Sequence, residues 1–78
     1  MSSNLRAEPV DRNKKNLSTS LKFILRKRYE EPINTLIDVN EIPYLTGIAD
    51  ANDSLAEEVK SLIQMIEKYG KISLKEEY

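Results

Sequence analysis

The 78-residue chain contains no histidine and no cysteine, and only two glycines. Without histidine, it lacks the side chain that most often serves as a general base near neutral pH and as a metal ligand. Without cysteine, it can form no disulfide, and zinc and iron–sulfur sites are excluded in practice. Neither glycine belongs to a phosphate-binding loop. The composition therefore predicts a protein that is not an enzyme, with no catalytic residue, no cofactor and no metal site.

Long apolar runs are also missing. No apolar stretch approaches the roughly 18 residues needed to cross a bilayer. Arg6, Glu8 and Asp11 interrupt any run near Met1 that could serve as the apolar part of a signal peptide. Together with the absence of cysteine, this predicts a cytoplasmic, intracellular protein that does not bind membranes.

The length limits the chain to one domain, which would bury only about 60% of its unfolded surface. Apolar residues are sparse before residue 17 and follow neither a helical nor a strand period. We therefore expect a flexible basic N-terminal arm over residues 1–16 and a single small domain over residues 17–78. So small a core makes self-association a possibility worth testing.

The net charge of −1 conceals an asymmetric distribution of charge. Residues 1–28 carry eight Lys or Arg and two acidic residues, whereas residues 29–78 carry four Lys and eleven acidic residues. Such a chain can steer toward an anionic partner with its basic half, or pair head to tail with itself. The simplest alternative is that the basic half lies against the acidic half of the same chain.

The clearest element spans residues 53–70, where apolar residues recur every three or four positions, as on one face of a helix. Ser54 and Glu57 fit a capping box at its start, with Asp53 as a competing cap. Gly70 can adopt the left-handed conformation that ends a helix. This segment is predicted to be the scaffold of the domain.

The segment between residues 33 and 39 alternates and is rich in β-branched side chains, as is typical of a strand. Asn40 and Pro43 mark the start of a second helix, in which Gly47 indicates close approach of another helix. Residues after Gly70 alternate again. Ile33, Thr35, Ile37 and Val39 lie on one side of the first strand, and Asn34, Leu36 and Asp38 on the other.

These elements predict a small single α+β domain in the order helix, strand, helix, helix, strand. A central αα-hairpin (41–51 and 54–69) would lie on a two-stranded sheet or ribbon (33–39 and 71–75). The alternative is a mostly α bundle.

The basic segment that precedes these elements fits two structures. Leu21 and Leu25 share one face of a helix that Ser18 or Ser20 can cap, whereas Leu21, Phe23 and Leu25 alternate as in a strand. Three consecutive basic residues suit the C-terminal end of a helix better than a paired strand. We therefore prefer the helix and keep the strand as an alternative.

Strand 33–39, helix 41–50 and helix 54–69, with a serine opening the second helix, resemble a ribbon-helix-helix repressor in outline. The resemblance implies nucleic-acid binding through the strand. The sequence departs from the pattern because Ile37 or Asp38 stands where a basic or amide side chain would face the major groove, and because a further strand follows Gly70. The second helix is acidic, so phosphate would repel it.

Candidate contact residues gather in the basic segment. A helix there would gather basic side chains around an aromatic ring able to stack on a base. Burial of Phe23 against a third element, or in a protein interface, is the preferred alternative. We take as candidate partner-binding residues Arg12, Lys14, Lys15, Lys22, Phe23, Arg26, Lys27 and Arg28.

We expect a small non-catalytic binding or regulatory protein that acts through protein–protein contacts, with itself as a homo-oligomer or with a host protein. By association, small chains of this composition suggest an inhibitor that a bacteriophage or mobile element encodes against a host activity. The alternative is a nucleic-acid-binding protein, either a ribbon-helix-helix-like repressor or a binder that uses its basic arm.

Overall fold

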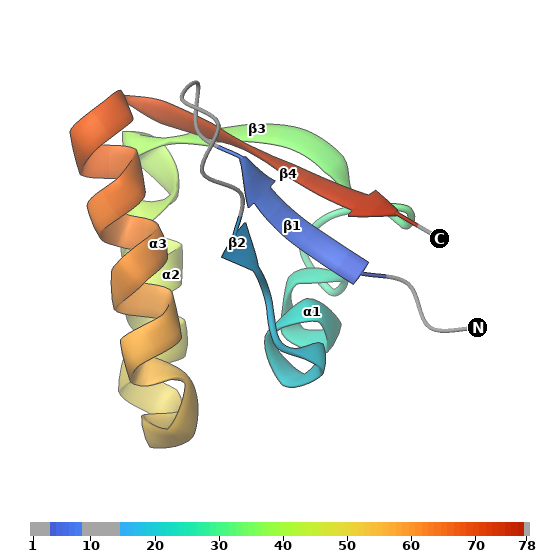
Figure 1. Cartoon of the computed structure of the whole chain (residues 1–78). Helices are drawn as coiled ribbons and strands as arrows, with labels where there is room; N and C mark the ends of the chain where they lie inside the picture. Colours follow the sequence, from blue (N-terminus) through green and yellow to red (C-terminus); the bar gives the residue numbers. More distant parts are fainter. Residues whose placement is uncertain (1–3, 9–14, 78) are drawn as a thin grey trace.

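The computed structural model describes residues 4–8 and 15–77, in which three helices cover one face of an antiparallel four-stranded sheet (Figure 1). The prediction of a small α+β domain is confirmed, with the αα-hairpin packed beside an antiparallel strand pair. The mostly α bundle is not formed. The elements are β1 (Asn4–Glu8), β2 (Lys15–Asn16), α1 (Thr19–Leu25), β3 (Asn34–Asp38), α2 (Ile42–Ala51), α3 (Ala56–Tyr69) and β4 (Lys71–Glu77), with 3-10 turns at Val39–Glu41 and Asp53–Leu55.

The strand order is β2-β1-β4-β3, so β3 lies at one edge of the sheet. β3 pairs with β4 as predicted, from Asn34 opposite Lys75 to Asp38 opposite Lys71. The sheet is larger than expected because β1 pairs along the other side of β4. The predicted flexible arm is therefore wrong for residues 4–8 and 15–16, while the rest of that prediction lies outside the described residues.

β1 joins the sheet because its side chains alternate. Leu5 and Ala7 face the core and are fully buried, while Arg6 and Glu8 lie on the opposite face. The helices cover the inner face and leave the outer face uncovered within the described part of the chain (Figure 1). That outer face carries Arg6, Glu8, Asn34, Leu36, Asp38, Lys71, Ser73 and Lys75.

The core lies between the inner face and the helices. Its apolar stripe on α3 is the predicted one, since Val59, Leu62 and Ile66 are fully buried. The remaining buried apolar residues are Leu5, Ala7, Leu17, Leu21, Leu25, Ile33, Ile37, Leu45, Ile48, Ala49, Leu55, Ile72 and Leu74. None of the described helices is long and apolar enough to span a membrane.

The basic segment forms the helix α1 rather than the alternative strand. The Ser18 hydroxyl accepts a hydrogen bond from the Leu21 amide at 3.2 Å, which caps the helix. Leu21 and Leu25 are buried and Phe23 points away from them, 55% exposed. The helix ends at Leu25, before the three consecutive basic residues that were expected at its C-terminal end. The chain continues in a turn whose Arg28 amide donates to the Leu25 carbonyl.

The helix ends agree only in part with the predictions. Asp38, not Asn40, caps the turn before α2, because its carboxylate accepts from the Asn40 amide at 2.9 Å. A 3-10 turn leads into α3, which has no side-chain cap, so the capping box of Ser54 with Glu57 is not formed. Gly70 ends α3 as predicted, with φ of 84° and its amide donating to Ile66 at 2.7 Å.

The two glycines give opposite predictions. A methyl group at Gly47 would meet nothing within 4 Å, so the expected close helix approach is absent there. Gly47→Ala should raise the free energy of unfolding by about 0.5–1 kcal/mol, because glycine is a poor helix former. Gly70→Ala should lower it by about 1 kcal/mol, because φ is positive. Urea titration of both variants measures the two changes, and stabilisation by Gly70→Ala would contradict this account.

Candidate functional site

The structure separates the candidate residues of the basic segment. Phe23 and Lys27 are exposed, whereas only 5% of the Lys22 surface is accessible. The Lys22 amine lies 5.9 Å from the Phe23 ring centroid, a cation–π distance. Arg12 and Lys14 lie outside the described residues, and Lys15 is described only as a residue of β2.

Arg26 is half-buried and contacts two acidic residues. Its guanidinium pairs with the buried carboxylate of Glu76 on β4, and its Nε lies 3.7 Å from Glu31. Its guanidinium carbon also lies 5.8 Å from the Phe23 ring centroid. These contacts join the end of α1 to the sheet, so Arg26 has a structural role within the domain.

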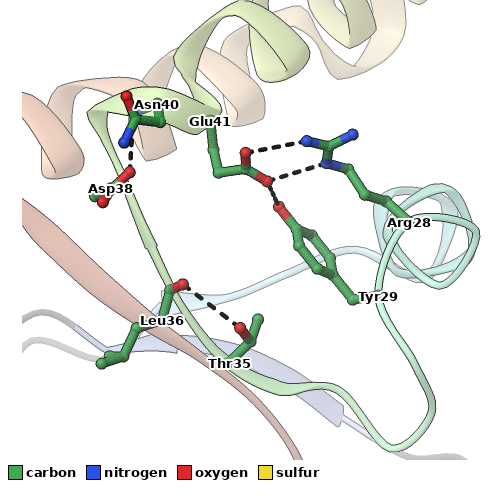
Figure 2. A network of polar contacts seen from close by, with 7 residues as sticks. All are labelled: Arg28, Tyr29, Thr35, Leu36, Asp38, Asn40 and Glu41. Carbon is green, nitrogen blue, oxygen red and sulfur yellow. Dashed lines mark hydrogen bonds and ion pairs between the residues drawn. The ribbon is translucent and has the colours of Figure 1, made fainter.

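Arg28 belongs to a bridge between the turn after α1 and the start of α2 (Figure 2). Its Nε and one terminal nitrogen donate to the two Glu41 carboxylate oxygens at 3.0 and 3.1 Å, a bidentate pair. The Tyr29 hydroxyl donates to the same carboxylate. The Arg28 guanidinium also lies over the Tyr44 ring, 4.4 Å from its centroid.

The bridge changes the acidity of its members. The hydrogen bond from Arg28, helped by that from Tyr29, lowers the pKa of Glu41 below its ordinary value. Burial, and then the neighbouring Glu41 carboxylate, raise the pKa of Tyr29 above its ordinary value. Burial likewise raises the pKa of Tyr44. At neutral pH the bridge therefore combines a charged guanidinium, a carboxylate and two neutral phenols.

The contacts of Arg26 and Arg28 support the simplest interpretation of the charge asymmetry, in which the basic half lies against the acidic half. A third contact also joins the first 28 residues to the acidic half. The backbone amide and the hydroxyl of Ser18 both donate to the Glu58 carboxylate, at 2.8 and 2.7 Å. Two of the candidate contact residues are thus already used within the chain.

An open groove of about 540 Å³ borders this bridge. It lies between the turn after α1 and the first residues of β3, and its walls combine charged, amide and hydroxyl groups. Within the described part of the chain, no three acidic residues are grouped so that they could hold a metal ion. The groove is lined by Arg28, Tyr29, Glu30, Glu31, Pro32, Asn34 and Thr35.

Two residues of β3, Asn34 and Thr35, line this groove. The open edge of β3 was not among the candidate contact residues. Leu36 on this strand is 66% exposed, and Val39 directly after it is 55% exposed. Val39 was expected on the same side of the strand as Ile37, but it begins the 3-10 turn instead. The signal for Leu36 was visible in the sequence, since it stood between Asn34 and Asp38 on the polar side of the alternation.

The carboxylate of Glu41 gives a prediction for pH dependence. A carboxyl with a lowered folded pKa adds stability above its unfolded pKa, near 4.5, and this stability is lost as pH falls through the folded pKa. Glu41→Gln should therefore lose less stability than the wild type between about pH 5 and 3. Urea titrations across this range test it, with Glu67→Gln, exposed on α3, as the control expected to keep the wild-type profile. Equal acid sensitivity of Glu41→Gln and the wild type would show that the bridge does not contribute.

Comparisons with protein families, with curated proteins and with solved structures find no match for this chain. The ribbon-helix-helix resemblance therefore keeps only the support of its element order. The contacts of the chain itself are the basis for inferring its function.

Proposed function

We propose that the chain is a non-catalytic protein-binding protein and that it makes its contact along the open edge of β3. The observation that carries this proposal is the row of outward-facing backbone groups on β3, next to an exposed Leu36. Addition of an extended segment to such an edge is a common mode of protein recognition, because the backbone supplies hydrogen bonds and alternate side chains supply specificity.

The direction of the backbone groups follows from the pairing of β3 with β4. The Glu76 amide donates to the Ile33 carbonyl at 2.7 Å, so Ile33 turns its backbone groups toward β4. In an antiparallel pair the hydrogen-bonded residues alternate, so Thr35 and Ile37 also turn their backbone groups toward β4. The amides and carbonyls of Asn34 and Leu36, and the amide of Asp38, therefore point to the open edge.

These outward groups are available for pairing. Within the described part of the chain, no strand lies on that side of β3. From the described residues, the Leu36 carbonyl accepts a single long bond, from the Thr35 hydroxyl at 3.5 Å. A second strand would therefore add hydrogen bonds without breaking any between β3 and β4, and it would also cover the exposed Leu36 side chain.

The internal ion pairs disfavour the nucleic-acid alternative. Arg26 and Arg28 are engaged with Glu76 and Glu41, so binding phosphate through them would require breaking contacts within the fold. Nucleic-acid affinity depends on the number of phosphates that free Lys and Arg neutralise. Contact through the backbone groups of β3 uses neither of these ion pairs.

A regulatory role follows from this mode of contact, because a protein without catalytic groups acts by occluding or assembling its partner. Self-assembly as a homo-oligomer is one form of it, and inhibition of a host protein by a bacteriophage or mobile-element product is another. The intracellular, cytoplasmic location suggested by the absence of cysteine stays a prediction.

The edge is tested by selecting extended peptides from a random display library on the chain, immobilised at low density. Wild type should enrich peptides. Leu36→Pro should not, because proline removes the outward amide but leaves the bonds to β4 intact. Leu36→Ala is the matched control that keeps the amide, so it should retain binding at reduced affinity. Enrichment by Leu36→Pro equal to that of wild type, with both folded by circular dichroism, would refute the use of this edge.

The alternative is tested with the full chain and a fluorescent 20-mer, as duplex and as single strand. We expect no binding at low salt, because the two arginines are paired within the fold. Binding that weakens steeply between about 50 and 200 mM salt would show phosphate contacts and would favour the nucleic-acid function instead. Anisotropy titrations at both salt concentrations measure this.

A further inference from the structure

We infer that the partner at the open edge of β3 is a second copy of this chain, paired antiparallel about Leu36. This inference rests on the proposed use of that edge and names its occupant. Three properties of β3 support it: the spacing of its outward backbone groups, the identity of the side chains that would face each other, and the position of its only charge.

The backbone of β3 is compatible with pairing to itself. Asn34 and Leu36 turn their amides and carbonyls toward the open edge, because their neighbours bond to β4, and Asp38 turns its amide there. The Asp38 carbonyl instead accepts the first bond of the 3-10 turn Val39–Glu41. A two-fold axis through Leu36 places Leu36 opposite Leu36 of the second copy, and Asn34 opposite Asp38. The Leu36 pair then exchanges two backbone bonds, and in each Asn34–Asp38 pair the Asp38 amide donates to the Asn34 carbonyl, so the edge forms about four backbone bonds.

The side chains match in this register. The two exposed Leu36 side chains lie side by side on the outer face and cover each other from water. Each Asp38 faces an Asn34 amide that can donate to its carboxylate. One Asp38 oxygen already accepts from the Asn40 amide, and a carboxylate accepts several such bonds.

Other registers are worse. A shift that centres the pair on Asp38 sets two carboxylates opposite each other, which is destabilising. A shift by one residue places the outward backbone groups of one copy opposite residues of the other copy whose backbone groups already bond to β4. A shift by two residues sets Leu36 against Asp38 or Asn34 and leaves outward groups of β3 unpaired. Of these registers, the one centred on Leu36 sets Asn34, Leu36 and Asp38 opposite outward-facing residues of the second copy without a like-charge contact.

The charge of the neighbouring strand supports the same arrangement. Lys71 and Lys75 of β4 flank Asp38 and Asn34 on the outer face. In the dimer each Asp38 therefore lies in a row between its own Lys71 and the second copy's Asn34, with the second copy's Lys75 beyond it. The two sheets become one continuous sheet, which removes the exposed edge of β3 from both copies.

Disulfide formation tests the register, because the wild-type chain has no cysteine and any disulfide of a single-cysteine variant joins two copies. Opposed residues of a hydrogen-bonded pair lie about 5.5 Å apart between Cα atoms, within reach of a disulfide. Leu36→Cys should therefore form a covalent dimer under mild oxidation. Asn34→Cys mixed with Asp38→Cys should form the mixed dimer.

The same two variants serve as controls when each is oxidised alone. Asn34 of one copy is about 13 Å from Asn34 of the other along this register, which is too far to bridge. Each should therefore stay monomeric on a non-reducing gel. Efficient dimerisation of Asp38→Cys alone, or failure of Leu36→Cys to dimerise, would overturn the inference.

Sedimentation equilibrium supplies a test without cysteine. Wild type should show a monomer–dimer equilibrium in the micromolar range or weaker, since a single strand pair buries less than the about 800 Å² per partner of a standard interface. Leu36→Lys should raise the dissociation constant at least about tenfold, because two ammonium groups would face each other. Gln64→Lys, exposed on α3, adds the same charge elsewhere and should leave the constant unchanged.

The outcomes separate this inference from the proposed function. A wild type that stays monomeric at about 1 mM overturns the second copy as the occupant. If the same protein still enriches peptides that Leu36→Pro does not, the edge binds a different protein and the proposed function stands. If the wild type neither dimerises nor enriches such peptides, both this inference and the proposed function fail.

Discussion

Glu76 places a carboxylate inside the protein, with 6% of the residue exposed. Removing a charge from water costs several kcal/mol unless it is paired and hydrogen-bonded. Glu76 meets both conditions, because it pairs with Arg26 and accepts from the Ile33 amide at 3.1 Å. That last contact replaces the ladder bond that Ile33 would otherwise donate to the Glu76 carbonyl. The end of α1, the beginning of β3 and the end of β4 therefore depend on one carboxylate.

This dependence limits what the basic segment can do. Arg26 neutralises a charge that would otherwise be unpaired inside the core, so it cannot turn toward an anionic partner without a large loss of stability. Arg28 is less committed, because its pair with Glu41 is more exposed. Both arginines nonetheless join α1 and its following turn to elements far along the chain. The charge asymmetry that suggested an external partner is thereby explained in good part by folding.

The sequence was most informative where a pattern repeats. α3 could be predicted because its apolar stripe persists over several turns and Gly70 ends it. β3 and β4 could be predicted because the alternation of apolar and polar residues is visible within each strand by itself. β1 was missed because only Leu5 and Ala7 face inward, and what makes them a strand is pairing with β4, at the other end of the chain. The cap before α2 was misassigned because Asp38 and Asn40 are both competent caps and backbone geometry decides between them. The candidate site was limited in the same way: charge and aromatic content drew attention to α1, but burial and pairing depend on tertiary contacts.

The two edges of the sheet differ in a way that bears on function. Proteins protect exposed edges by making them short or by placing proline or lysine on them, because an open edge recruits other strands. β2 follows this rule, with only two residues. β3 does not: over Asn34–Asp38 it has neither proline nor lysine, its single charge is at its end, and its centre is an exposed leucine. A sheet that protects one edge, and at the other carries a strand with an exposed leucine and no described strand on its outer side, has the asymmetry expected of a specific interface. Of the exposed large apolar side chains in the described part of the chain, Leu36 and Val39 lie together on β3 and the turn that follows it, whereas Phe23 belongs to α1. General instability of a small domain would not place two of the three at one edge of the sheet.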